Sequence, residues 1–252
     1  MKKKHLVTRR TAIAAGLTSL GGILLTGCVK KAPPAYGNIL RMGDALTYAA
    51  QRTLLPGQSL VKEYQPADIS AFPATGTTNP GDLARRGDHE IPYSTSYAQL
   101  HNGSFADWRL CIEGSVARPA HFSLADLRAF APRTQITRHT CEEGWTAIAQ
   151  WTGVPLRDVL SKTGIGKNAR YVNFFAYDGY MESIDMLDAL HPQTILAYGM
   201  NGQDLPVPHG APVRVRVERQ IGYKSVKYLQ RILVTDEFVD PGDTGWAWYT
   251  GI

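Results

Sequence analysis

The segment from Thr137 to Trp145 carries residue types suited to redox or nucleophilic chemistry. Cys141 follows a run of β-forming residues and precedes a glycine turn, with Arg138 and His139 before it and Glu143 after it. A thiol flanked by cations is stabilised as the thiolate, which is both the nucleophilic and the metal-ligating form of cysteine. A buried structural cysteine and a cysteine hydrolase are the alternatives, although nothing here resembles the known local motifs of cysteine proteases.

Two further segments combine cations with glycines. His209 and Arg214 lie in the first, and Lys224, Ser225 and Lys227 lie in the second. Such groups bind phosphate through charge-assisted hydrogen bonds, and glycine lets the backbone approach a ligand closely. A solvated strand face is the alternative interpretation of the same residues.

The elements that must position these segments are mainly strands. Short helices are predicted at Ser123–Arg128, with Ser123 as N-cap, and at Pro155–Lys162, with Gly164 beyond its end. Asn201-Gly202 predicts a tight hairpin turn. Alternation of apolar and polar residues predicts strands at Trp108–Glu113, Arg133–Thr140, Tyr171–Ala176, Ile195–Met200, Gln203–Pro206, Val213–Glu218 and Val226–Val234. The run Val213–Glu218 alternates as a strand with one solvent-facing side would, and the fold class is α+β.

The first 28 residues have the pattern of an export signal. Basic residues open the chain, the short apolar run Thr11–Leu25 follows, and small residues precede Cys28. The run is too short for a membrane-spanning helix. Arg9-Arg10 resembles a twin-arginine signal and Leu25–Cys28 resembles a bacterial lipobox. We therefore expect export to the periplasm and membrane anchoring by lipidation of Cys28, with a plain cleaved signal as the alternative.

The net charge of +5 belongs to this first segment. Five of the 27 basic residues and none of the 22 acidic residues precede Cys28, so the remainder of the chain is neutral. No basic stripe is left to bind nucleic acid, and we expect membrane contact only through the lipid. The pattern divides the chain into a signal (1–28), a tether with an irregular N-terminal segment (29–70) and one domain (71–252), and little periodicity is visible over 29–100.

Several ordered motifs together resemble the sulfite-oxidase family of molybdopterin-binding oxidoreductases, in particular its small exported bacterial branch. The resemblance runs from Phe105 to Glu237. It rests on the three segments above and on Trp151 to Leu156, His191 to Ala197 and Arg219 to Tyr228. It implies a sulfite-oxidase-type domain of mixed β-sheets with short helices, and one molybdenum-molybdopterin cofactor per chain.

The resemblance also implies roles for individual residues. Cys141 would be the thiolate ligand of molybdenum, and Arg138 and Glu143 would tune its sulfur and position the substrate. The other matched positions would contact the pterin and its phosphate, namely His139, His209, Arg214, Lys224, Ser225, Val226 and Lys227. His209 stands where the reductases of this branch usually have Asn and where sulfite oxidases have His.

Some positions depart from the family pattern. Ala176 stands where the branch has a cofactor-contacting Thr, and Tyr177 or Asp178 could replace it. The N-terminal pterin contact of the branch could fall on Asn79 or on His89–Tyr93. The remaining conspicuous residues, Cys111, Trp246 and Trp248, are interpreted as core packing.

The resemblance implies oxygen-atom or electron transfer at a mononuclear molybdenum centre. Sulfite oxidases have paired arginines shortly after the ligating cysteine, whereas this chain has Gly144–Thr146 there, so a sulfoxide or an N-oxide is the expected substrate. A sulfite dehydrogenase-like enzyme and a non-catalytic envelope binding or assembly lipoprotein are the alternatives. A membrane haem protein or cytochrome is the expected electron partner, and a monomer is expected because the chain ends soon after Lys227.

Overall fold

The computed structural model describes residues 46, 50, 59–71, 78–82, 93–141 and 143–239. The signal 1–28, most of the tether and the tryptophans Trp246 and Trp248 lie outside the described residues. None of the described helices is long and apolar enough to cross a membrane.

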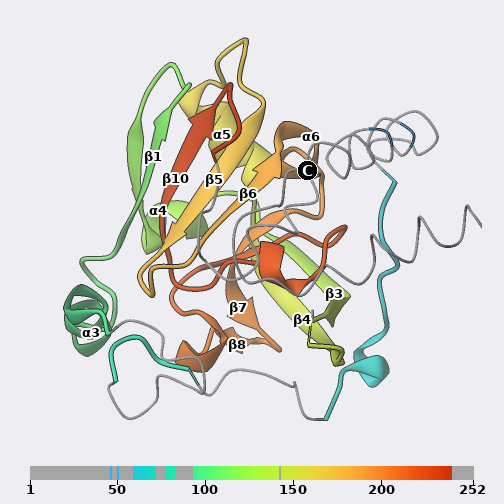
Figure 1. The fold of residues 1–252 in the computed structure, drawn as a ribbon. Helices are drawn as coiled ribbons and strands as arrows, with labels where there is room; N and C mark the ends of the chain where they lie inside the picture. The colour runs from blue at the N-terminus through green and yellow to red at the C-terminus, as the bar shows by residue number, and fades with distance from the viewer. Residues whose placement is uncertain are drawn as a thin grey trace, which may run out of the picture. The chain divides into compact units, whose positions relative to one another are not determined.

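The described strands form two five-stranded sheets, which confirms the predicted α+β class (Figure 1). The first sheet has the order β2-β1-β10-β5-β6, in which β1 and β10 run parallel and the other neighbours run antiparallel. It comprises β1 (Arg109–Gly114), β2 (Ala120–Ser123), β5 (Tyr171–Ala176), β6 (Met181–Asp185) and β10 (Leu229–Thr235). The second sheet has the order β3-β4-β7-β8, and β9 also pairs with β7. It comprises β3 (Arg133–Thr140), β4 (Thr146–Pro155), β7 (Ile195–Met200), β8 (Gln203–Asp204) and β9 (Arg214–Arg216).

The helices are short, as predicted. They are α3 (Thr95–Asn102), α4 (Leu124–Arg128), α5 (Leu156–Thr163) and α6 (Met186–Ala189), with single 3-10 turns at Pro66–Asp68, Val207–His209 and Gly222–Lys224. Helix α4 begins at Ser123, whose hydroxyl caps it in a capping box with Asp126. Helix α5 follows Pro155 and ends at Thr163, because the C-cap residue Gly164 has a φ of 75°, outside the helical range. Asn201 and Gly202 have φ of 50° and 78°, which confirms the predicted hairpin turn between β7 and β8.

The structure corrects the sequence prediction at several elements. Helix α3 begins within the stretch 29–100, where the sequence shows little periodicity, and its N-cap is Ser94, whose side chain accepts from the N–H of Tyr97. Strands β2, β4 and β6 were not predicted. The last strand begins at Leu229 rather than Val226, because Tyr228 has a φ of 52° and interrupts the extended backbone.

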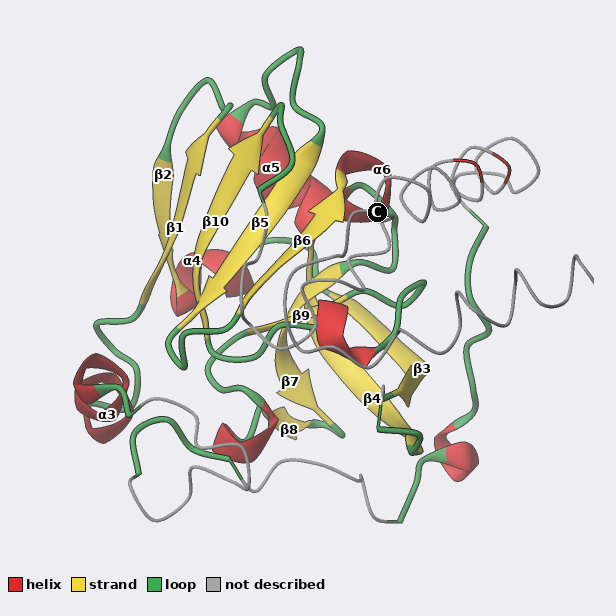
Figure 2. Ribbon diagram, viewed as in Figure 1, coloured by secondary structure: helices red, strands yellow, loops and turns green. Residues whose placement is uncertain are grey.

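The two sheets contribute to one hydrophobic core. Leu110 and Ile232 of the first sheet lie in the same buried cluster as Val154 and Leu196 of the second, together with residues of α4 and α5. Figure 2 shows α4 and α5 behind the strands of the first sheet. The buried indole of Trp108 donates to the carbonyl of Leu229 (3.0 Å) and so joins the start of β1 to the start of β10.

Cys111 does not lie in this core. Residues alternate between the two faces along β1, so Leu110 and Ile112 are fully buried while Cys111 is half-buried on the opposite face. The thiol is free. The core-packing interpretation of Cys111 is therefore wrong.

Candidate functional site

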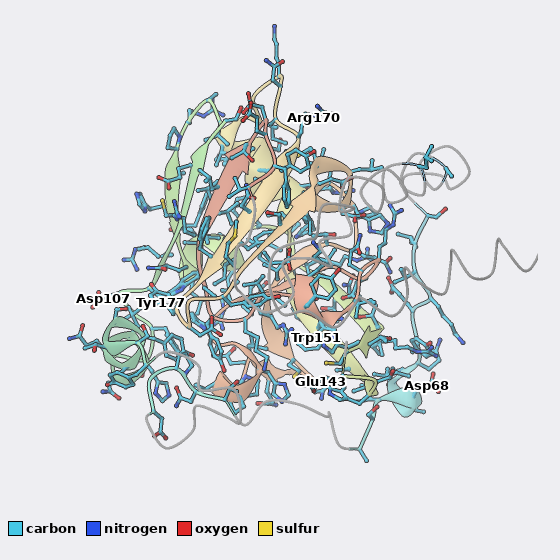
Figure 3. All side chains as sticks on the ribbon, in the orientation of Figure 1. Asp68, Asp107, Glu143, Trp151, Arg170 and Tyr177 are labelled. Atoms are coloured by element: carbon cyan, nitrogen blue, oxygen red, sulfur yellow. The ribbon has the colours of Figure 1, made fainter. Side chains whose placement is uncertain are left out.

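The loop Cys141–Trp145 closes the hairpin between β3 and β4, whose pairing ends at Thr140 and Thr146. The N–H of Cys141 donates to the carbonyl of Trp145 (2.9 Å), and Gly144 has a φ of 92° within the turn. The thiol of Cys141 is buried and lies 3.7 Å from Oε2 of Glu143, which also accepts from the indole N–H of Trp145 (2.6 Å). The structure thus brings Glu143 beside the sulfur, where the resemblance places a tuning group. Glu143 is labelled in Figure 3.

The second and third sequence segments run side by side. The N–H of Val215 donates to the carbonyl of Val226 (2.8 Å), and the N–H of Leu229 donates to the carbonyl of Val213 (3.0 Å). The hydroxyl of Ser225 accepts from the N–H of Val217 (3.3 Å). Ser225 and Val226 are buried, and each holds its segment against the strand that carries Arg214.

Five basic side chains from three segments influence one another electrostatically beside the Cys141 loop. We call them the cationic cluster: His139, His209, Arg214, Arg216 and Lys227. Burial lowers the pKa of His139 far below its usual value, and the positive charges of Arg216 and Arg214 lower it further. Burial and the positive charge of Arg214 lower the pKa of Lys227 to about 8, while the negative charges of Asp178, Cys141 and Glu143 act to raise it.

Both arginines of β9 lie on its inner side, which contradicts the prediction of a strand with a solvent-facing side. Arg214 and Arg216 are 3% and 1% exposed. The guanidinium of Arg214 donates to the carbonyls of His209 (3.1 Å) and Ser225 (2.8 Å), and that of Arg216 pairs with Glu218 (2.8 Å). These partners compensate for the hydration that the two guanidinium groups lose on burial. Strand β9 therefore has a valine face toward the core and an arginine face toward the site.

The aromatic ring of Trp151 lies against both guanidinium groups. The Cζ atoms of Arg214 and Arg216 are 5.1 and 4.5 Å from its ring centre. Figure 3 labels Trp151 on β4, in the same lower part of the view as Glu143. A cation over an indole face is stabilised by the ring quadrupole, so Trp151 offsets part of the repulsion between two neighbouring positive charges.

The residues at this site fit an anionic, hydrogen-bonding cofactor. Nε of Arg214, Nε1 of Trp151 and Oγ1 of Thr137 are buried, and within the described part of the chain they have no hydrogen-bond partner. Buried donors are normally satisfied, so orphaned ones beside a cationic cluster indicate that a ligand supplies the acceptors. Burial, together with the neighbouring positive charges, lowers the pKa of His209 to about 4 and that of Lys227 to about 8, and a bound anion would favour the protonated form of both groups.

Gly210 provides the close backbone approach that the segment pattern indicated. Its φ is 105°, and an added Cβ would lie 2.8 Å from the Cβ of Lys227. Ala211 follows Gly210, and its carbonyl accepts from the hydroxyl of Tyr97 (2.7 Å), so the loop that carries Gly210 is tied to α3. In the ranges described, no group of three or more His, Cys, Asp and Glu residues could hold a metal ion by itself.

Two of the predicted basic site residues do not belong to the cationic cluster. Arg138 is exposed and points to the opposite side of β3 from His139, where its guanidinium lies 5.4 Å from the ring centre of Tyr64. Lys224 is fully buried and donates to Glu182 (2.9 Å) and to the carbonyl of Ser183 (2.7 Å). The carboxylate of Glu182 thus compensates for the buried charge of Lys224.

The structure also shows where the residues that depart from the family pattern lie. Ala176 is buried at the end of β5, and burial raises the pKa of nearby Asp178, whose carboxylate accepts from the N–H of Tyr180 (3.0 Å). Asn79 accepts from the N–H of Gly81 (2.9 Å), next to the point where Tyr228 donates to the carbonyl of Thr78 (2.7 Å). The segment 78–82 is thereby held beside the residue that follows Lys227. The alternative stretch 89–92 lies outside the described residues.

Sequence reasoning missed Arg216, Trp151 and Thr137. The alternation of Val and Arg over Val213–Glu218 was the available signal for Arg216, because it places Arg214 and Arg216 on one side of a strand. Trp151 was noted as part of a motif without a role. Nothing in the local sequence distinguishes Thr137 from its neighbours.

These features define a buried cationic site beside a cysteine on an α+β scaffold, and comparison with known proteins gives its class. Residues 97–241 match the model of the oxidoreductase molybdopterin binding domain, and the chain belongs to this family. It is a molybdopterin-binding oxidoreductase, and its cofactor is molybdenum-molybdopterin.

Particular relatives narrow the comparison. A protein of Azospira oryzae, provisionally named protein-methionine-sulfoxide reductase subunit YedZ1, is 33% identical over 98% of this chain and 89% of its own length. The protein-methionine-sulfoxide reductase catalytic subunits MsrP of Ralstonia nicotianae and Burkholderia mallei are 34% and 29% identical. Those matches cover 52% and 90% of this chain, and 44% and 69% of the relatives.

The fold is also similar to a solved structure. The sulfane dehydrogenase SoxCD from Paracoccus pantotrophus superimposes with a TM-score of 0.51 at 25% identity, over 53% of this chain and 39% of that chain. This similarity agrees with a molybdopterin-binding fold.

Proposed function

We propose that this chain is the catalytic subunit of a cell-envelope reductase that converts a sulfoxide, foremost methionine sulfoxide in proteins, to the sulfide. The observation that carries the proposal is the buried Cys141, whose sulfur lies 3.7 Å from Glu143 and interacts electrostatically with Lys227 of the cationic cluster, together with the buried atoms of Arg214, Trp151 and Thr137 that have no hydrogen-bond partner among the described residues. The names of the relatives from three bacteria support the substrate class.

In this proposal Cys141 is the single protein ligand of molybdenum. Arg214 and Lys227 bind the phosphate of the pterin, and His139 and His209 contact its polar edge. The bound cofactor supplies the two-electron redox chemistry. The chain contributes a buried, positively charged site that orients the cofactor and excludes water, and Glu143 sets the hydrogen bonding around the sulfur.

The overall reaction requires an external electron donor. Reduction of a sulfoxide consumes two electrons and two protons and releases the sulfide and water. We propose that a membrane haem protein or cytochrome delivers the electrons, and that the chain works as a monomer with one cofactor. We also propose twin-arginine export to the periplasm, with Cys28 lipidated there. A Cys28→Ser variant is expected to move from the membrane fraction to the soluble periplasmic fraction, and its retention in the membrane would refute the anchor.

The decisive experiment uses full-length protein from cells that make the cofactor. We expect about one molybdenum per chain by elemental analysis, together with oxidation of a reduced viologen dye on addition of methionine sulfoxide. Dimethyl sulfoxide, an N-oxide and sulfite complete the panel, with sulfite tested for oxidation by an electron acceptor. Turnover of sulfite alone would favour the sulfite dehydrogenase-like alternative, and folded, loaded protein without turnover of any compound would favour a binding lipoprotein.

A further inference from the structure

Arg216 occupies a position in the site that the matched family motifs do not cover. Its guanidinium forms a fork on the carboxylate of Glu218, with Nε to Oε1 at 3.1 Å and Nη2 to Oε2 at 2.8 Å. Both side chains are buried, at 1% and 0% exposure. Gln135 also donates to Oε1 of Glu218 (3.0 Å), so the carboxylate is held from two sides.

The remaining guanidinium nitrogen of Arg216, Nη1, points to His139. Nη1 of Arg216 donates to Nδ1 of His139. An arginine has only donors, so Nδ1 of His139 acts as the acceptor and the ring hydrogen of the neutral imidazole resides on Nε2. The contact therefore selects both the orientation of the ring and the nitrogen that offers a hydrogen to the site.

His139 in turn contacts the loop that carries the thiol. Its ring centre lies 5.5 Å from that of Trp145, at an interplanar angle of 39°. The carbonyl of Trp145 accepts from the N–H of Cys141, and its indole donates to Glu143. A continuous series of contacts thus leads from buried Glu218 through Arg216, His139 and Trp145 to the sulfur.

We propose that Arg216, clamped by Glu218, is a positioning residue that acts through His139 to orient the Cys141 loop and to present the Nε2–H of His139 to the cofactor. The inference rests on the proposed function in taking Cys141 as the molybdenum ligand. Each of the three guanidinium nitrogens of Arg216 bonds to Glu218 or His139, so Arg216 acts on the cofactor through His139. The ring of Trp151 packs against the guanidinium, with its centre 4.5 Å from the Cζ of Arg216.

Two variants separate positioning from charge. Arg216→Lys keeps the positive charge but loses the planar fork, which a single ammonium cannot reproduce. Arg216→Met/Glu218→Gln removes the fork without leaving a buried carboxylate unpaired, so it tests the inference in a folded protein if the single variant unfolds. The matched control is Arg231→Lys, since Arg231 likewise pairs with a glutamate, Glu113 (2.7 Å), and stacks on an aromatic ring, Phe175 (3.8 Å), but lies on the other sheet.

The first measurement needs no cofactor. In cofactor-free protein labelled with nitrogen-15 on histidine, the two ring nitrogens of His139, assigned with a His139→Gln variant, are expected to report one fixed tautomer. Both Arg216 variants should shift these resonances toward an averaged pair, and Arg231→Lys should leave them in place. Unchanged His139 resonances in the Arg216 variants would overturn the inference.

The second measurement uses loaded protein. The electron paramagnetic resonance signal of Mo(V) should broaden or shift in both Arg216 variants, with kcat falling by about 10-fold or more and KM unchanged, because partners that orient a ligand typically have this effect. Arg216→Lys with a wild-type signal and turnover would show that charge alone matters and would also overturn the inference. If wild-type protein contains no molybdenum, the proposed function fails, while the nitrogen resonances still decide whether Arg216 orients His139.

Discussion

Gly210 and Lys227 pack so closely that a Cβ added to Gly210 would lie 2.8 Å from the Cβ of Lys227. The contact joins the segment that carries His209 to the segment that carries Lys227. The approach of Lys227 to the segment that carries His209 and Arg214 therefore depends on the absence of a side chain at Gly210.

Gly210→Ala should destabilise the protein more than Gly202→Ala. Both glycines have positive φ, at 105° and 78°, and both variants incur the left-handed penalty of about 1–2 kcal/mol. Nothing lies within 4 Å of an added Cβ at Gly202, so only Gly210→Ala adds a steric overlap. Denaturant unfolding of the cofactor-free variants measures the difference, and equal free energies of unfolding would contradict the packing described.

Lys227→Met should weaken retention of the cofactor. A hydrogen bond to a charged group contributes about 1.5–3 kcal/mol, which corresponds to about a 10- to 150-fold loss of affinity. Lys162→Met is the matched control, because Lys162 is exposed on α5. Molybdenum content after dialysis compares the two, and equal retention would exclude Lys227 as a phosphate ligand.

His209 should make the cofactor-free protein sensitive to acid. Burial, with Lys227 and Arg214, lowers its pKa from 6.5 to about 4. Between these values the unfolded chain binds the proton more readily, so the stability contributed by neutral His209 is complete above about pH 6.5 and is lost as the pH falls toward 4.

The variant His209→Asn tests this pH dependence. Asparagine does not titrate, so the drop in melting temperature from pH 7 to pH 5 should be smaller in the variant than in wild-type protein. The other buried histidines are common to both proteins and cancel in the comparison. An equal drop would mean that His209 is not held neutral in the folded state.

Cys141→Ala should abolish turnover and change the Mo(V) signal while leaving the pterin bound, because in the proposed function the cationic cluster holds the phosphate independently of the thiol. Cys111→Ala is the control, since Cys111 is also a free cysteine but lies on the outer face of β1. Pterin fluorescence after denaturation measures retention. Wild-type turnover by Cys141→Ala would refute the ligand assignment.

Lys224→Met should destabilise the fold by about 3–5 kcal/mol, because it leaves the buried carboxylate of Glu182 unpaired. The double variant Lys224→Met/Glu182→Leu should recover most of that loss. Molybdenum per folded chain is expected to stay at the wild-type level in the double variant. A proportional loss of molybdenum would instead support a direct contact between Lys224 and the cofactor.

Local chemistry was sufficient to predict several elements. Strands β3 and β5 follow from runs of β-forming residues, α4 from the capping box at Ser123, and the β7–β8 turn from Asn201-Gly202. Each depends on contacts between residues near in sequence, which a pattern encodes directly. The motifs around Cys141 and Lys227 likewise indicated the family that the comparisons establish.

The direction in which each charged side chain points was decided by the tertiary structure. Arg138 and His139 are adjacent in sequence, yet Arg138 lies over the ring of Tyr64 while His139 contacts Arg216 of strand β9. Lys224 and Lys227 are three residues apart, yet only Lys227 belongs to the cationic cluster. A buried charge goes where a partner compensates for its lost hydration, and Glu182, which is 42 residues from Lys224 in sequence, is brought there only by the fold.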